Sequence, residues 1–156
     1  MKWCEWLEKW NMVSLRMKSP FLEAEWKPED KDKDAAWELY IELLTRITTQ
    51  RLPDEYGDER TALESVYRLF DLTREIIKAH GRECIEFTKI AIVILNQKVR
   101  PFTAKWHKIM VGDGLNGETI RKEFRCDLEE LRSLLKIYSK MLADMAGVED
   151  LTDLDD

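Results

Sequence analysis

The sequence has few of the residues that most often build a metal centre or a disulfide framework. It contains two histidines, His80 and His107, and this number excludes a histidine-rich metal centre. Its three cysteines, Cys4, Cys84 and Cys126, are odd in number and far apart, so they predict neither a disulfide framework nor a structural zinc site. We therefore expect reduced thiols, no metal and no cofactor.

The chain also lacks a long apolar run. Its longest aliphatic stretch, Ile90 to Leu95, is far too short to cross a bilayer. The first ten residues are interrupted by Glu5 and Glu8, whereas a signal peptide has an uninterrupted apolar centre. These features predict a cytoplasmic protein in solution, without a membrane partner.

The sequence has fewer basic than acidic residues. The 156 residues include 25 Lys and Arg against 31 Asp and Glu, which gives a formal net charge of −6. This balance disfavours nonspecific coating of DNA, so only a local site could bind nucleic acid. With 44% hydrophobic and 36% charged residues, the composition is typical of one soluble globular domain and argues against disorder.

The spacing of apolar residues predicts an all-α fold. Apolar side chains recur at steps of three and four, which is the period of one helical face. We predict a four-to-five-helix bundle that forms a single domain over residues 1–147, with a short extended N-terminal connector. The long helices are expected at about 35–50, 58–80, 83–100 and 118–146. The third is apolar on nearly all sides, which is typical of a central helix.

The last nine residues, 148–156, form an acidic tail. They contain five acids and no base. Such a segment is expected to be loosely held or to act as a contact segment.

The N-terminal ten residues carry three tryptophans on one helical face. Trp3, Trp6 and Trp10, with Leu7, fall at i, i+3, i+7 and i+4 of a short helix. Such an apolar face either packs on the protein's own bundle or forms an oligomer interface, because Trp is favoured at the centre of interfaces.

The segment that follows changes pattern. From Val13 to Trp26 apolar and polar residues alternate, and Pro20 interrupts them, which predicts an extended connector or a small hairpin. Next come Asp30, Asp32 and Asp34, which lack the glycine and the closing glutamate of a calcium loop. We interpret these acids as the N-terminal cap of the first long helix.

One local patch reverses the charge of the chain. No acid lies between Glu86 and Asp113. The basic residues of this interval are Lys89, Lys98, Arg100, Lys105 and Lys108. With Phe102 and Trp106 interleaved, the patch is suited to RNA, because cations neutralise phosphates and aromatic faces stack on bases. The alternative is a solvated helix face whose Lys and Arg pair with acids elsewhere in the protein.

Within this patch, Arg100 and His107 form the chemically suggestive pair. They are seven residues apart, and this spacing places both on one face of a helix, two turns apart. Pro101 lacks an amide hydrogen but fits the first turn of a helix, so we expect the chain to bend at Arg100 and a second helical piece to begin there. Arg74 and His80 have a similar spacing, but an offset of six turns them about 120° apart.

An Arg and a His separated by four to six residues in an all-helical protein resemble the HEPN superfamily of metal-independent ribonucleases and RNA-binding domains. Here six residues separate Arg100 from His107. The resemblance implies a helical bundle that dimerises and joins two Arg and His pairs in one RNA-cleaving cleft. His107 would transfer the proton and Arg100 would hold the phosphate. Many such proteins are toxins or effectors of bacterial antiviral systems.

Two hypotheses of function follow. The first is an RNA-directed, HEPN-like protein, with Arg100 and His107 as catalytic residues of a metal-independent endoribonuclease. In this hypothesis the RNA-binding residues are Lys98, Lys105, Lys108, Phe102 and Trp106. The second is a non-catalytic helical bundle that acts as an adaptor or interaction subunit of a larger complex, docked through the Trp-rich N-terminus or the acidic tail. The first implies a homo-oligomer, such as a dimer, and the second a larger protein partner.

Overall fold

The computed structural model describes residues 1–46, 48–54, 57–112 and 114–154, and within these ranges the protein is all-α, which confirms the predicted fold class. The extended structure in these ranges is one isolated antiparallel bridge, between Lys2 and Glu25. The helices in chain order are α1 (Trp3–Lys9), α2 (Ser19–Leu22), α3 (Asp30–Leu44), α4 (Glu59–His80), η1 (Gly81–Glu83), α5 (Ile85–Ile94), η2 (Leu95–Val99), α6 (Arg100–Val111) and α7 (Glu118–Ala146). None of the described helices combines the length and the apolar character that a membrane crossing requires.

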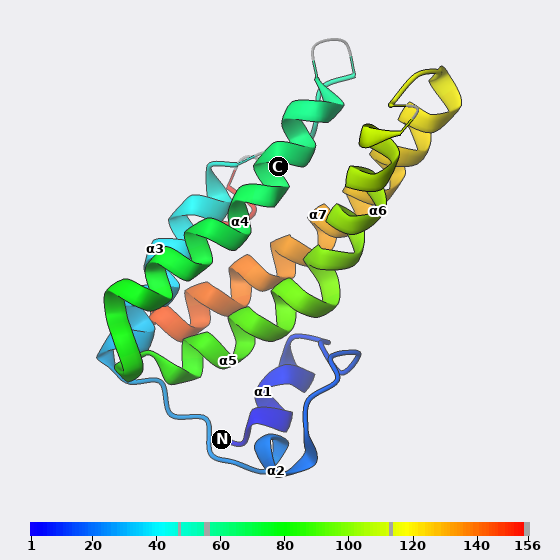
Figure 1. Cartoon of the computed structure of the whole chain (residues 1–156). Helices are drawn as coiled ribbons and strands as arrows, with labels where there is room; N and C mark the ends of the chain where they lie inside the picture. Colours follow the sequence, from blue (N-terminus) through cyan, green and yellow to red (C-terminus); the bar gives the residue numbers. More distant parts are fainter. Residues whose placement is uncertain (47, 55–56, 113, 155–156) are drawn as a thin grey trace.

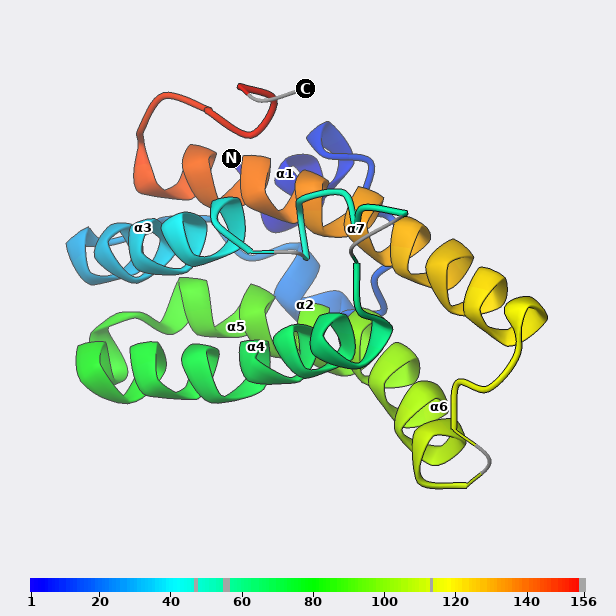
Figure 2. The ribbon, with the colours of Figure 1, turned by 90° about the horizontal axis from the view of Figure 1, so that it is seen from above.

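Four helices of the body lie in two layers. Figure 2 shows α3 and α7 side by side in one layer and α4 and α5 in the other, and Figure 1 shows that α4 and α5 diverge from the turn that joins them. The helix α6 and the first turns of α7 extend beyond this body, and α1 and α2 pack below α5 in the view of Figure 1. The arrangement leaves one face of α6 beside α4 and another beside α7.

The long helix α7 follows its predicted apolar stripe. The buried residues of this stripe recur at alternating steps of four and three, which place them on one face: Phe124, Leu128, Leu131, Leu135, Tyr138 and Leu142. The helix ends at Gly147, which adopts a left-handed φ of 69° as a C-cap. The sequence therefore predicted this helix and its end.

The helix α3 begins and ends earlier than predicted, at Asp30 and Leu44. Glu29 and Asp32 form a capping box at its start, as the capping interpretation of the acidic segment predicted. Asp32 is fully buried, and its other carboxylate oxygen accepts the backbone N–H of Phe87, at 2.9 Å, in the first turn of α5. The carboxylate therefore joins the starts of two helices.

The bend expected at Arg100 is a π-helical segment. α5 continues through η2 into α6, and Figure 1 shows that the helix changes direction there. Pro101 cannot donate to the preceding turn, and the N–H of Arg100 bonds to the carbonyl of Leu95, five residues back. The expectation that this helix is central is wrong, because Ile85 and Ile92 on α5 are about half exposed.

The N-terminal tryptophans pack on the chain itself. Trp3 and Trp6 are fully buried, whereas Trp10 is partly buried. Trp6 stacks on Trp26 with ring centroids 4.9 Å apart and donates from Nε1 to Asp144 of α7, at 2.6 Å. Of the two sequence-based alternatives, burial favours packing on the bundle, because Trp3 and Trp6 have no surface left for a second copy.

The predicted N-terminal connector is partly helical. Pro20 lies in the first turn of α2, where its missing N–H costs nothing because the first N–H groups of a helix have no partner within the helix. Extended backbone is found at Lys18, just before α2, and at the bridge between Lys2 and Glu25. The predicted extended connector therefore contains one short helix.

The acidic tail returns to the bundle over its described residues. The N–H of Leu151 donates to the Tyr40 hydroxyl of α3, at 2.5 Å, and Thr152 is buried. Asp153 forms ion pairs with Lys136 and Lys140 of α7. These contacts fix the tail along α3 and α7; its last two residues, 155 and 156, lie outside the described part of the chain.

Candidate nucleic-acid site on α6

The basic patch predicted from the sequence is divided between two faces of α6. Arg100 and His107 face α4, where each contacts an aromatic ring. Lys105 and Trp106 face α7, where each contacts acidic Asp127. The predicted site therefore does not form one continuous surface.

On the face of α6 that is turned toward α4, Arg100 and His107 are exposed to solvent. Both side chains are exposed. The Arg100 guanidinium carbon lies 4.9 Å from the centroid of the Phe70 ring, and Nε and Nη2 donate to Asn96 Oδ1 at 3.1 and 3.0 Å. The His107 ring lies 5.8 Å from that of Tyr67, at an interplanar angle of 69°. Water and a ligand can reach both groups.

A hollow lies between these two helices beside Arg100. Its volume is about 220 Å³. The residues that line it are Tyr67, Phe70, Asp71, Arg74, Arg100, Thr103 and Ala104. Asp71 and Arg74 form an ion pair within it, whereas Arg100 bonds to the neutral Asn96 and forms no ion pair with a described carboxylate. The charge of Arg100 suits an anionic group such as a phosphate.

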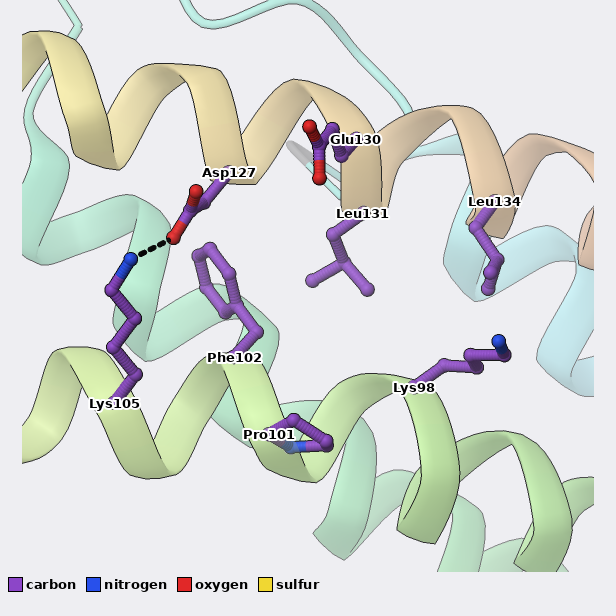
Figure 3. Close-up of a pocket in the computed structure, with 8 residues that line it drawn as sticks. All are labelled: Lys98, Pro101, Phe102, Lys105, Asp127, Glu130, Leu131 and Leu134. Atoms are coloured by element: carbon purple, nitrogen blue, oxygen red, sulfur yellow. Dashed lines mark hydrogen bonds and ion pairs between the residues drawn. The ribbon is translucent and has the colours of Figure 1, made fainter.

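Lys105 is paired with acids of α7. Its Nζ lies 2.8 Å from Glu123 Oε1 and 2.6 Å from Asp127 Oδ2, and Figure 3 shows the second of these contacts. These hydrogen bonds, first with Asp127 and then with Glu123, raise the pKa of Lys105. For this residue the ion-pair alternative stated above describes the structure, and its charge is largely neutralised.

The two aromatic residues of the predicted patch are buried. Trp106 is fully buried and donates from Nε1 to Asp127 Oδ2 at 3.0 Å, and Phe102 is 8% exposed. Both rings contact Phe124 of α7. Their assignment as RNA-binding residues is therefore wrong in this conformation, because a buried ring offers no face for a base; the helical period makes them core residues.

The remaining lysines of the patch lie apart. Lys98 is partly buried, and its Nζ lies 3.2 Å from Ser14 Oγ in the N-terminal connector. Lys98 and Lys105 also border a hollow of about 330 Å³ between α6 and α7, whose floor is Phe102, Leu131 and neighbouring apolar side chains (Figure 3). Lys108 is exposed one residue after His107. Of the three lysines, Lys108 is therefore the closest in sequence to the Arg and His pair.

The second Arg and His pair is engaged elsewhere. His80 Nε2 lies 2.8 Å from Glu38 Oε1, and the His80 side chain is only 11% exposed. Arg74 pairs with Asp71 on its own helix. His80 thus links the end of α4 to α3, which agrees with its exclusion on helical geometry.

The described part of the chain contains no cluster of side chains suited to a metal ion. No group of three or more His, Cys, Asp or Glu side chains there is arranged to hold a metal ion. The three cysteines are free thiols: Cys84 is buried, Cys4 is partly buried and Cys126 is exposed.

Comparisons of the chain with protein-family models, with curated proteins and with solved structures found no match. The likeness to the HEPN superfamily therefore stays a prediction based on the residues themselves.

No pattern in the sequence indicated that α4 contributes residues to this site. Tyr67 and Phe70 belong to the apolar stripe of α4, and such a stripe is usually assigned to the core. Phe70 is indeed buried, but Tyr67 is 39% exposed beside His107. No spacing in the sequence links α4 to α6, so only the fold could bring these residues together.

Proposed function

We propose that this chain is an RNA-directed, HEPN-like protein in which Arg100 and His107 serve a metal-independent endoribonuclease. One observation carries the proposal: the two side chains are exposed on the same side of α6, and each lies against an aromatic ring of α4. An open imidazole and an open guanidinium are the groups that cleavage of RNA without a metal requires.

In the proposed reaction the ribose 2′-oxygen attacks the adjacent phosphorus. His107 removes the 2′-hydroxyl proton or protonates the departing 5′-oxygen, because imidazole has a near-neutral pKa in water that suits both roles. A bond forms between the 2′-oxygen and phosphorus, and the bond to the 5′-oxygen breaks. The products are a 2′,3′-cyclic phosphate and a 5′-hydroxyl. Arg100 stabilises the charge on the phosphate oxygens.

The spacing within one chain favours a dimer. Residues seven apart on a helix are separated by roughly 10 Å along its axis. The Arg100 side chain also bonds to Asn96 in the preceding turn, on the side away from His107. We therefore propose that two copies face each other across α6 and that each active cleft uses groups from both, as the resemblance implies.

Single substitutions test the two catalytic roles. We expect His107→Ala and Arg100→Ala each to slow cleavage of a labelled single-stranded RNA at least 100-fold in the presence of EDTA. This is the usual loss of rate when a proton-transfer group, here His107, or a group that stabilises transition-state charge, here Arg100, is removed. His80→Ala is the matched control, since it removes the other histidine. Expression of the wild-type chain should also slow bacterial growth, and His107→Ala should relieve this effect.

The second hypothesis predicts a different outcome for the same variants. If the chain is a non-catalytic adaptor, His107→Ala and His80→Ala behave alike in the RNA assay. If His107→Ala also has a lower melting temperature, without a loss of RNA cleavage or of growth inhibition, the role of His107 is to pack α6 on α4. Melting temperatures of all four proteins distinguish this result from loss of a catalytic group.

A further inference from the structure

A second surface lies away from the α6 site, in the groove between α3 and α4. The groove has a volume of about 440 Å³. The residues that line it are Trp37, Glu38, Ile41, Glu42, Leu72, Glu75, Ile76 and Ala79. We call it the α3–α4 groove. It contains neither Arg100 nor His107, so it requires a separate explanation.

The apolar part of the α3–α4 groove is partly exposed to solvent. Trp37 is 43% exposed and Ile41 is 38% exposed, and they are one helical turn apart on α3. The opposite side of the same helix, with Leu39 and Leu43, is buried in the core. An exposed tryptophan is typical of a protein interface.

The charged part of the groove is acidic. Its lining includes Glu38, Glu42 and Glu75 and no Lys or Arg. Glu38 contacts His80, and Glu42 pairs with Arg46 at 2.7 Å. Glu75 makes no ion pair with another described residue. Arg46 therefore largely neutralises Glu42, and Glu75 of α4 is the carboxylate of the groove whose charge no described cation balances.

We propose that the α3–α4 groove binds a basic amphipathic α-helix of a partner protein. Apolar side chains at i, i+3, i+4 and i+7 of that helix would cover Trp37 and Ile41, as in other complexes in which a helix fills a groove. Its Lys and Arg side chains would lie over Glu75, which forms no ion pair with a described residue, and beside the paired Glu38 and Glu42. Charge complementarity selects this partner, because an anionic membrane or a nucleic acid would be repelled by the same glutamates.

Among the helices that the structure describes, a second copy of the chain offers none of this kind. Its basic helix is α6, but Phe102 and Trp106, which form the apolar face of α6, are buried against α7. The exposed face of α6 carries Arg100, His107 and Lys108. The occupant of the α3–α4 groove is therefore a different chain.

A pair of synthetic peptides tests the proposal. The first is a fluorescein-labelled 14-residue helix with Leu at i, i+3, i+4 and i+7 and Lys on both flanks; in the second every Lys is replaced by Glu. We expect the Lys peptide to bind the full-length protein and the Glu peptide to bind at least tenfold more weakly, as measured by fluorescence anisotropy. Binding of the Lys peptide should weaken as salt is added.

Matched substitutions locate the binding site. Ile41→Glu and Glu75→Lys should each weaken binding of the Lys peptide to the protein at least tenfold. Ile92→Glu on α5 and Glu64→Lys on α4 change equally exposed residues outside the groove and should leave binding unchanged. Glu75→Lys alone is decisive if Ile41→Glu does not fold. RNA cleavage by Glu75→Lys should remain that of the wild type, so this test is independent of the proposed nuclease.

Several results would overturn the proposal. They are equal binding of the two peptides, no binding of the Lys peptide, or equal weakening by the control substitutions. Self-association in analytical ultracentrifugation that Ile41→Glu abolishes would also overturn it, because the occupant would then be a second copy.

Discussion

At the scale of single residues, the buried carboxylate of Asp32 connects two helices that are distant in sequence. One oxygen accepts the N–H of Glu29 at 2.8 Å, and the other accepts that of Phe87 at 2.9 Å. Hydrogen bonds to a charged group contribute more than neutral ones, and a buried N–H without a partner is costly. Asp32 therefore stabilises the start of α3 and the start of α5 together.

Replacing Asp32 tests this connection. We expect Asp32→Ala to lower the free energy of unfolding by roughly 2 to 3 kcal/mol, because two backbone donors lose a charged acceptor. Urea denaturation at neutral pH measures the change. Asp30→Ala removes an exposed carboxylate from the same helical turn. An equal loss in both variants would contradict the role of Asp32.

A second single-residue effect depends on pH. Asp58 is the N-cap of α4, and its side chain accepts the N–H groups of Arg60 and Thr61. Hydrogen bonds, first from the Thr61 hydroxyl and then from its backbone N–H, hold the pKa of Asp58 below its usual value. A lowered folded-state pKa means that the stabilisation is complete above the unfolded-state pKa and is lost as the pH falls through the folded-state value.

We therefore expect Asp58→Ala to lower the free energy of unfolding by about 1 kcal/mol at pH 7, the usual contribution of an N-cap. The difference from the wild type should shrink as the pH falls from the unfolded-state pKa, about 4, towards the lowered folded-state pKa of Asp58. Asp58→Asn keeps a capping acceptor without the titrating group, so its stability relative to Asp58→Ala should change little with pH. Urea denaturation from pH 7 to pH 3 measures all three proteins. A wild-type advantage that persists unchanged at pH 3 would argue against the carboxylate.

At the scale of elements, α1 is attached to the body through tryptophan. Trp6 is fully buried, stacks on Trp26 and donates to Asp144 of α7. Trp3 makes the corresponding contact with α5, since its Nε1 donates to Glu86 at 2.8 Å. A helix of seven residues has little stability alone, so these contacts determine whether α1 forms.

Truncation of the buried ring tests the attachment. We expect Trp6→Ala to lower the free energy of unfolding by roughly 3 to 5 kcal/mol, the usual cost for a buried aromatic residue. Trp37→Ala removes a ring that is 43% exposed and should cost much less. Thermal denaturation followed by circular dichroism compares the two variants. Similar melting temperatures for both would show that α1 does not depend on Trp6.

The elements also show what the sequence could and could not predict. The long apolar stripes of α4 and α7 predicted these helices, and the Pro101 signal predicted a bend. Periodicity could not distinguish an open face from a buried one, so Phe102 and Trp106 were assigned to RNA although α7 covers them. The helix α2 escaped prediction because its four residues are too few to show a period.

The candidate site could be predicted only in part, because residue spacing fixes positions along one helix and not the contacts between helices. The offset of seven placed Arg100 and His107 on one face, and the structure has both exposed beside α4. The contacts with Phe70 and Tyr67 depend on how α6 crosses α4, and no local pattern encodes this crossing. The pairing of Lys105 with Glu123 and Asp127 likewise depends on the approach of α7.

At the scale of the whole molecule, the two proposed surfaces have opposite charge. The hollow between α4 and α6 presents Arg100 and lies near His107, whereas the α3–α4 groove presents glutamates. In a chain with a net charge of −6, an RNA strand is repelled by most of the surface and attracted only locally. Under the two proposals, this separation would leave room for a protein partner and an RNA to bind at the same time.

The most direct measurement compares an RNA strand with a DNA strand of the same sequence, each incubated with the purified protein in EDTA. If His107 activates a ribose 2′-hydroxyl, the RNA is cut to 2′,3′-cyclic phosphate ends, the DNA stays intact, and His107→Ala cuts neither. Cleavage of both strands, or equal cleavage of RNA by His107→Ala and the wild type, would contradict the account.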